Sequence, residues 1–200
     1  LVMQGWLFHI SANFWQPTQT KAVLNAVPDG KLMILDLYAE TNPIWQQTNA
    51  FYGKPWIWCM LHNFGGNIAM FGRMDAAAKD PAEALNNPAS GNMKGIGLTP
   101  EGIAQNPVMY ALMLENVWRN TPTDPEQWLK MYARNRYGII NPHAEKAWEV
   151  LRHTVYNGGK AEGGAESIIT GRPTFHTSTP WAKTPLSYDA EKLLPAWHEM

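Results

Sequence analysis

Acidic side chains follow apolar runs at two places in this 200-residue chain. Asp36 and Glu40 lie in the segment DLYAE, which closes the run 31–38, and Glu101 follows the run 92–98. Two carboxylates held about 5 to 5.5 Å apart can cleave a glycosidic bond with retention of configuration, one as nucleophile and the other as acid/base. All three acids are therefore candidates for glycosyl-transfer chemistry.

Each of these acids also has a structural interpretation. Thr99, Pro100 and Glu101 together would make a good helix start, with Thr99 as N-cap and an acid in the first turn facing the macrodipole. Asp36 and Glu40 could instead be hydrogen-bonding acids that orient other side chains. The spacing alone leaves both interpretations open.

His62 and Asn63 follow a third apolar run, 55–61. Imidazole and amide groups both donate and accept hydrogen bonds, so these residues could bind a metal, act as a base or contact sugar hydroxyls. No second histidine stands at metal-ligand spacing, so substrate contact is predicted, and neither a metal nor another cofactor is expected. Cys59 is the single cysteine and lies within this run, which predicts a small buried hydrophobe.

The elements that must position these residues are predicted from four apolar runs, at 1–8, 31–38, 55–61 and 92–98. Near-continuous hydrophobicity is typical of parallel strands that are covered on both faces. Helix signals stand between the runs, at 17–27, at Asn42-Pro43 and at Asp80-Pro81. A (β/α)8 barrel takes about 250 residues and has its active site at the carboxyl ends of its strands. Residues 1–122 are therefore predicted to form the C-terminal half of a TIM-type α/β barrel.

The pattern changes to helices without strands from Asn106 onward. Val108 and Leu112 lie on one apolar stripe, and Asp124 and Asn141, each followed by proline, are typical N-caps of two further helices. Residues 123–200 are therefore predicted to begin an all-α C-terminal domain. Within it, the Gly-rich stretch 157–164 is predicted to be an exposed loop.

The composition restricts the partners. With 16 basic and 17 acidic residues, the chain has no electrostatic footprint for nucleic acid or an anionic membrane surface. No apolar run approaches the roughly 20 residues that span a bilayer, so no membrane span is expected. Ten tryptophans beside only 16% charged residues suit a sugar-binding surface, although a Trp-rich core would give the same count.

Blocks at the predicted strand ends resemble glycoside hydrolase family 89, the α-N-acetylglucosaminidases. The blocks are QGWLF at 4–8, LDLYAE at 35–40, WCMLHNFGGN at 58–67 and GIGLTPEGIAQNPVMY at 95–110. They stand in the family's order and spacing, and the resemblance covers nearly the whole chain, most weakly from 157 onward. It implies hydrolysis of terminal non-reducing α-linked N-acetylglucosamine from glycans, with retention.

The resemblance also implies roles for individual residues. The family's nucleophile is the glutamate of its PEGI-like motif, which corresponds to Glu101. The acid/base glutamate would lie upstream of Leu1 with the remainder of the barrel, so this chain alone is expected to be inactive. The sugar pocket would be lined by side chains from three strand ends, with two polar residues near the hydroxyls: Trp6, Leu37 and Trp58, with His62 and Asn63.

Departures from the family are peripheral. Pro107 replaces an acid found in the lysosomal relative, the stretch 157–164 lacks the cysteines found there, and the chain has no N-glycosylation sequon. These differences favour a bacterial member. The family resemblance implies action outside the cytoplasm, in the periplasm or as a secreted enzyme. Two alternatives stay open: a non-catalytic carbohydrate-binding barrel, and a retaining barrel glycosidase of different sugar specificity.

Overall fold

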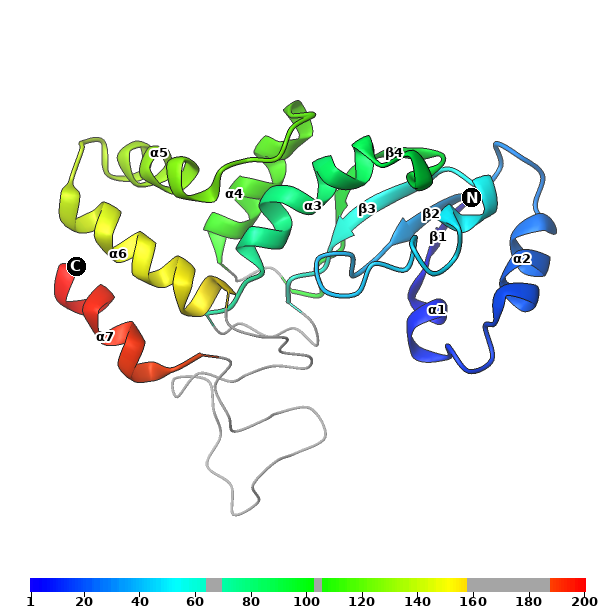
Figure 1. Ribbon diagram of the computed structural model, residues 1–200, viewed down its shortest axis with the longest axis horizontal. Helices are drawn as coiled ribbons and strands as arrows, with labels where there is room; N and C mark the ends of the chain where they lie inside the picture. The colour runs from blue at the N-terminus through cyan, green and yellow to red at the C-terminus, as the bar shows by residue number, and fades with distance from the viewer. Residues whose placement is uncertain (64–69, 103–105, 158–187) are drawn as a thin grey trace, which may run out of the picture.

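The computed structural model describes residues 1–63, 70–102, 106–157 and 188–200. A parallel four-stranded sheet, in the order β1-β2-β3-β4, forms one part of the molecule (Figure 1). Its strands are β1 (Val2–Gln4), β2 (Met33–Asp36), β3 (Trp56–Met60) and β4 (Met93–Leu98). Sequence order equals spatial order, and every pair is parallel, so the predicted strand-helix repeat of an α/β fold is confirmed.

Helices connect the strands. The connections contain α1 (Trp6–Ile10), α2 (Pro17–Asn25), η1 (Ala50–Gly53), α3 (Met74–Asn86) and η3 (Pro88–Ser90). The helices after β4 are α4 (Pro107–Glu115), η4 (Asn116–Trp118), α5 (Pro125–Tyr137), α6 (Pro142–His153), η5 (Val155–Asn157) and α7 (Ala190–Glu199). The change from strands to helices thus occurs where the sequence predicts it. The Gly-rich stretch 157–164 lies outside the described residues beyond Asn157.

The two faces of the sheet differ in burial. Ile34, Trp56 and Met60 are fully buried and pack in one cluster with apolar residues of α3. Leu35 and Ile57, which alternate with them and point to the opposite face, are only partly buried. The helix-covered face therefore carries the core.

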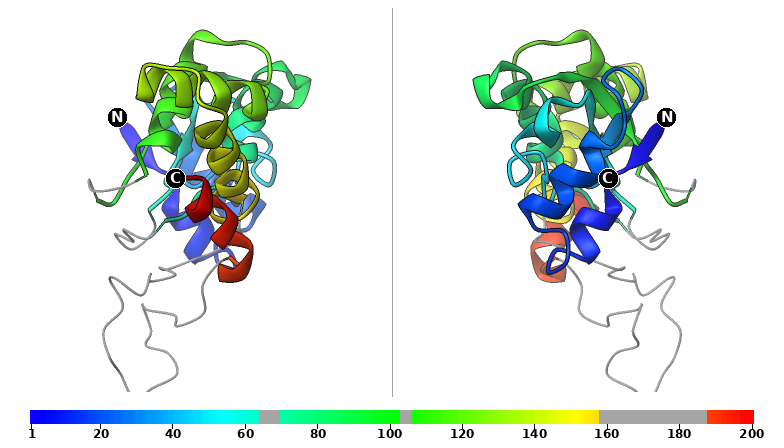
Figure 2. Two further views of the ribbon diagram at one scale, coloured as in Figure 1. Left: turned by 90° about the vertical axis from the view of Figure 1, so that its left-hand side faces the viewer. Right: turned by 90° about the vertical axis from the view of Figure 1, so that its right-hand side faces the viewer.

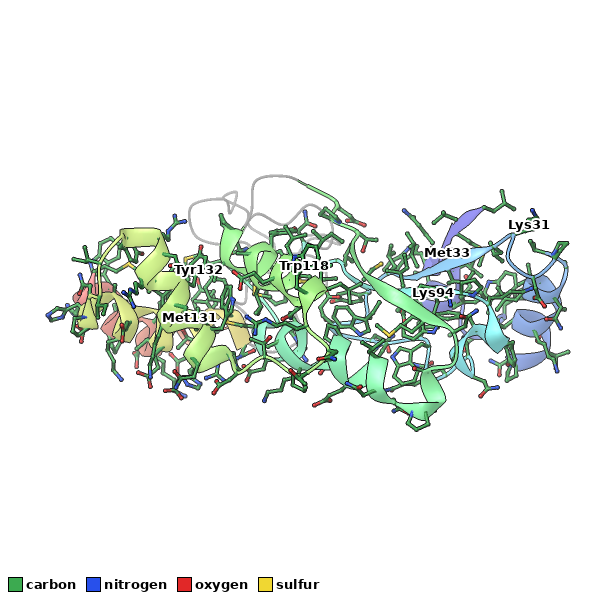
Figure 3. All side chains as sticks on the ribbon, turned by 90° about the horizontal axis from the view of Figure 1, so that it is seen from above. Lys31, Met33, Lys94, Trp118, Met131 and Tyr132 are labelled. Carbon is green, nitrogen blue, oxygen red and sulfur yellow. The ribbon has the colours of Figure 1, made fainter. Side chains whose placement is uncertain are left out.

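The molecule is elongated. End-on views place α1 and α2 at one end and α5, α6 and α7 at the other (Figure 2). From above, Lys31 and Met33 lie at the sheet end and Met131 and Tyr132 at the helical end, with Trp118 between (Figure 3). Helix α6 packs against both α5 and α7. No helix in the described ranges has the length and apolar character needed to cross a membrane.

Three local predictions are wrong. The first apolar run does not form a strand to Phe8, because β1 ends at Gln4 and α1 begins at Trp6. Asn42-Pro43 starts no α-helix; the Asn42 amide instead contacts His9 Nδ1 at 3.3 Å. Asp80-Pro81 does not open a helix either, because α3 begins six residues earlier at Met74 and runs through the proline.

Candidate active site

Hydrogen bonds beyond the strand ladder tie the carboxyl ends of β2, β3 and β4 together. Ala39 N donates to Cys59 O at 3.0 Å, and Thr99 N donates to Met60 O at 3.0 Å. The Thr99 hydroxyl donates to Leu37 O at 2.8 Å. The residues that follow three separate strands are thereby held side by side, which is the geometry on which barrel enzymes build their sites.

Glu101 lies just after β4 and outside the described helices, because α4 begins at Pro107. The structure therefore does not show the helix first turn that its sequence context also allowed. Its backbone N–H donates to Asn63 Oδ1 at 2.7 Å, and the residue itself is exposed. An exposed acid on an anchored backbone at a strand end is placed to meet a ligand.

The His62 and Asn63 side chains lie beside this segment and are 3% and 1% exposed. His62 Nε2 is 3.1 Å from Asn106 Nδ2, and the imidazole packs edge-on against Tyr110, with centroids 5.4 Å apart. Burial lowers the pKa of His62 to about 4. The imidazole is therefore neutral at physiological pH, so it can offer one donor and one acceptor.

Glu40 is a buried carboxylate that binds backbone groups. It is 3% exposed, and its Oε1 accepts hydrogen bonds from Leu61 N at 3.0 Å and His62 N at 2.6 Å. Burial raises its pKa to about 7, although the hydrogen bonds from the backbone act in the opposite direction. The interpretation of Glu40 as an acid that orients other residues is the one that its contacts support.

Asp36 has the same kind of role on the helix-covered side of the sheet. Its two carboxylate oxygens accept hydrogen bonds from Ile44 N at 3.2 Å and Trp45 N at 2.9 Å. Burial raises its pKa to about 7. His9 Nε2 lies 3.9 Å away, and burial lowers the pKa of His9 to about 4, so both groups favour their neutral forms.

The aromatic and apolar residues assigned to the sugar pocket separate into two groups. Trp6 follows β1 after Gly5, with its ring 5.4 Å from that of His9, and Leu37 directly follows β2. Trp58 instead lies within β3, is 1% exposed and belongs to the core cluster under α3. The structure brings Trp6 and Leu37 to the strand ends and places Trp58 in a packing position.

The sequence analysis missed two polar residues of the site, Asn106 and Tyr156. Besides its contact with His62, Asn106 accepts a hydrogen bond at Oδ1 from the Tyr156 hydroxyl at 3.3 Å. Tyr156 lies in η5, so the helical region reaches the strand ends. Asn106 precedes Pro107 and α4, a pattern typical of a helix N-cap and not of a site residue, and Tyr156 has no sequence signal for a site role. Within the described ranges, no three His, Cys, Asp or Glu side chains are grouped to hold a metal ion.

Comparisons with known proteins agree with this organisation. Residues 1–120 match the family described as "Alpha-N-acetylglucosaminidase (NAGLU) tim-barrel domain", and residues 128–200 match its "C-terminal domain". Human α-N-acetylglucosaminidase is 44% identical over 199 residues, which are 98% of this chain and 26% of the human protein. A family 89 glycoside hydrolase from Clostridium perfringens superposes with a TM-score of 0.84 at 32% identity, over 99% of this chain and 22% of that one.

These matches place the chain among the glycoside hydrolases that have a TIM-barrel domain. Since the barrel-domain match alone covers residues 1–120 of 200, the chain belongs to the α-N-acetylglucosaminidase (NAGLU) family. It spans about a quarter of the length of the relatives that it matches.

Proposed function

We propose that this chain supplies the nucleophile of a retaining exo-glycosidase that removes terminal non-reducing α-linked N-acetylglucosamine from glycans. The observation that carries the proposal is the placement of Glu101 at the carboxyl end of β4, with its backbone held by Asn63. A variant of the Clostridium perfringens relative with two glutamates replaced by glutamine was solved with its substrate GlcNAc-α-1,4-galactose. Those two replacements fit a two-carboxylate mechanism.

In the proposed reaction, a carboxylate oxygen of Glu101 attacks the anomeric carbon and the glycosidic C–O bond breaks. The leaving oxygen takes a proton from the acid/base residue. That residue then removes a proton from water, which attacks the glycosyl–Glu101 ester, releases the sugar and restores the Glu101 carboxylate. Two inversions at the same carbon give net retention.

The acid/base residue is proposed to come from outside this chain. The two other carboxylates near the strand ends, Asp36 and Glu40, are buried and occupied with backbone N–H groups. Neither is available to protonate a leaving group. We therefore expect the isolated chain to be inactive.

The sheet is proposed to be the C-terminal half of a (β/α)8 barrel formed by residues 1–122, with 123–200 beginning the all-α domain. Among the described residues, β1 and β4 each pair with a single neighbouring strand, and Leu35 and Ile57 face away from the helices. Both features suit a sheet that closes with further strands around an interior. The remainder of the barrel is thus a required partner.

We propose that the sugar contacts are made at the same strand ends, by Trp6, Leu37, His62 and Asn63. An indole ring gives an apolar surface for a sugar ring, and a neutral imidazole pairs with a hydroxyl. The site of action is proposed to be extracytoplasmic on the basis of the family resemblance, and cell fractionation with an antibody against the protein would test this.

The Glu101→Ala variant of the full-length enzyme tests the assignment. Turnover of an aryl α-N-acetylglucosaminide should fall by at least about 10³-fold, because the covalent step loses its nucleophile, while substrate binding persists. Azide should restore turnover and yield the β-glycosyl azide, since a small anion can enter the space that the carboxylate leaves. The matched control is Glu149→Ala, which removes an exposed acid of α6.

Two results would contradict the proposal. Normal turnover by Glu101→Ala would remove the nucleophile assignment. First formation of the β-anomer by the unmodified enzyme, seen by proton NMR, would exclude retention. If the unmodified full-length protein binds α-N-acetylglucosaminides but turns over none of a panel of aryl glycosides, the carbohydrate-binding alternative holds.

A further inference from the structure

A strained turn at the end of β3 is the starting point. Asn63 N donates to Leu61 O at 2.8 Å, and the residue between them, His62, has φ +65°. A three-residue turn with positive φ at its centre is rare and strained, above all for a residue other than glycine. Surrounding contacts must therefore hold His62 in this conformation.

The carboxylate of Glu40 makes those contacts. Its Oε1 accepts hydrogen bonds from His62 N at 2.6 Å and Leu61 N at 3.0 Å, and its Oε2 lies 3.2 Å from Leu61 N. Glu40 comes from the segment after β2, so these hydrogen bonds join the ends of two strands. Since the carboxylate is buried, water does not compete for its oxygens.

The same turn contacts two residues of the chain that follows β4, Glu101 and Asn106. Asn63 Oδ1 accepts the hydrogen bond from Glu101 N at 2.7 Å. At the other end, His62 Nε2 lies 3.1 Å from the Asn106 amide. Two adjacent side chains of the turn thus hold the backbone at Glu101 and the side chain of Asn106.

We propose that Glu40 is a positioning residue for the glycosidase reaction: it holds the His62 turn, and the turn places Glu101 at the anomeric carbon. Glu40 itself does not contact the substrate. This inference rests on the proposed function of Glu101. It predicts an effect on the chemical step, because a displacement of about 1 Å at a reacting group can lower a rate by roughly 10²-fold.

The test compares Glu40→Ala and Glu40→Gln in the full-length enzyme. Glu40→Ala leaves the turn without its acceptor, so kcat per folded molecule should fall roughly 10- to 100-fold while KM changes little. Glutamine keeps one oxygen that can accept from both N–H groups, so Glu40→Gln should recover most of kcat. Circular dichroism gives the folded fraction by which each kcat is corrected.

Asn116→Ala is the matched structural control. Asn116 is also buried, and its amide makes two hydrogen bonds, to Ala77 O and from the Thr123 hydroxyl, both 2.7 Å long and away from the strand ends. Asn116→Ala should lower the melting temperature without changing kcat per folded molecule. If Glu40→Ala behaves like Asn116→Ala, with kcat unchanged, Glu40 is structural only and the inference is overturned.

Coupling to Glu101 separates this inference from the proposed function. In the azide-rescued Glu101→Ala enzyme, the further change Glu40→Ala should have at most a small effect, because no carboxylate remains to be positioned. A full additional loss would overturn the inference while leaving Glu101 as nucleophile. Normal turnover by Glu101→Ala alone would instead refute the proposed function.

If Glu40→Ala does not fold, Asn63→Ala tests the same chain of contacts. It removes the acceptor of Glu101 N and leaves the Glu40 carboxylate in place. A lower kcat would support the inference, whether or not KM also rises through loss of the proposed sugar contact of Asn63. A raised KM at constant kcat would mean that Asn63 serves substrate binding only, and would overturn it.

Discussion

Two buried carboxylates four positions apart, Asp36 and Glu40, serve different parts of the molecule. Asp36 fixes the backbone of Ile44 and Trp45 on the helix-covered side, and Glu40 fixes the turn at His62 near the candidate site. Each carboxylate satisfies two backbone N–H groups that would otherwise be buried without a partner, a situation that costs about 1 to 3 kcal/mol per group.

The pH dependence of stability should reveal the buried Asp36. Burial raises its pKa from 3.8 to about 7 in the folded state. Between these values the folded state keeps a proton that the unfolded state has lost, so Asp36 contributes stability below pH 4 that is lost as the pH rises toward 7. Asp36→Asn gives up one hydrogen-bond acceptor but does not ionise.

Urea unfolding of the full-length protein at pH 5, 6 and 7 measures this difference. The variant should be less stable at pH 5, and the gap should narrow as the pH rises, by at most about 1.4 kcal/mol per pH unit. His9, the neighbouring titratable group, is present in both proteins, and His9→Gln in both backgrounds controls for its protonation. A gap that widens with pH would contradict the raised pKa.

Some residues of the candidate site could be predicted from the sequence and others could not. The positions of Glu101, His62 and Asn63 at strand ends follow from apolar runs that stop at polar residues. The contact between Asn106 and Tyr156 could not be predicted, because it joins segments 50 positions apart and depends on how the helical region packs.

At the scale of elements, the same dipeptide signal gives different results in different surroundings. Asn141 and Asp124, each before a proline, cap α6 and α5 as predicted. Asn42 before Pro43 does not, because Asp36 already accepts the N–H groups of the next two residues and holds them in an irregular segment. Local propensity determines the secondary structure of a segment when its tertiary contacts are weak. At Asn42-Pro43, the hydrogen bonds to the buried Asp36 carboxylate override this propensity.

The first apolar run shows a similar limit. The run stays apolar as far as Phe8 although the strand ends earlier. Phe8 is apolar because it is buried against Trp15 and Phe51. The strand ends at Gln4, just before Gly5, whose N–H donates to Leu35 O and where an added Cβ would lie 2.8 Å from that same oxygen. An apolar run of this length does not distinguish a buried strand from a strand followed by a short buried helix.

The cap of α5 gives a prediction at this scale. Asp124 Oδ1 accepts hydrogen bonds from Glu126 N at 2.9 Å and Gln127 N at 3.3 Å. Asp124→Ala should lower the free energy of unfolding by about 1 kcal/mol, and Asp124→Asn should lose much less, because asparagine is an equally good N-cap. Thermal unfolding checks this, and equal losses in both variants would mean that the charge and not the cap matters.

At the scale of the whole molecule, the helical region is fastened to the strand region at the start of α3. Arg152 of α6 donates two hydrogen bonds to Asp75 Oδ1, at 3.0 and 2.9 Å. Asp75 N in turn donates to Asn157 Oδ1 at 3.0 Å. With the hydrogen bond from Tyr156 to Asn106, these contacts make the helical region a support of the candidate site.

Gly72 packs against side chains of the helical region, Met109 of α4 and Tyr156 of η5. A Cβ at this position would be 2.7 Å from Met109 Sδ and 2.9 Å from Tyr156 Cδ1, well inside van der Waals contact. Gly72→Ala should therefore lower the free energy of unfolding of the full-length protein by roughly 1 to 3 kcal/mol through overpacking. It should also lower kcat, because the Tyr156 ring is pushed away from Asn106.

Two further variants separate packing from hydrogen bonding. Tyr156→Phe keeps the ring and removes only the hydroxyl, so it should cost about 0.5 to 1.5 kcal/mol, the value of one hydrogen bond. Met109→Ala removes one of the two side chains that the added methyl group meets, so Gly72→Ala should cost less in that background than in the unmodified protein. Strict additivity of Gly72→Ala and Met109→Ala in urea unfolding would show that the Met109 side chain does not obstruct the methyl group, and would contradict the overpacking at this contact.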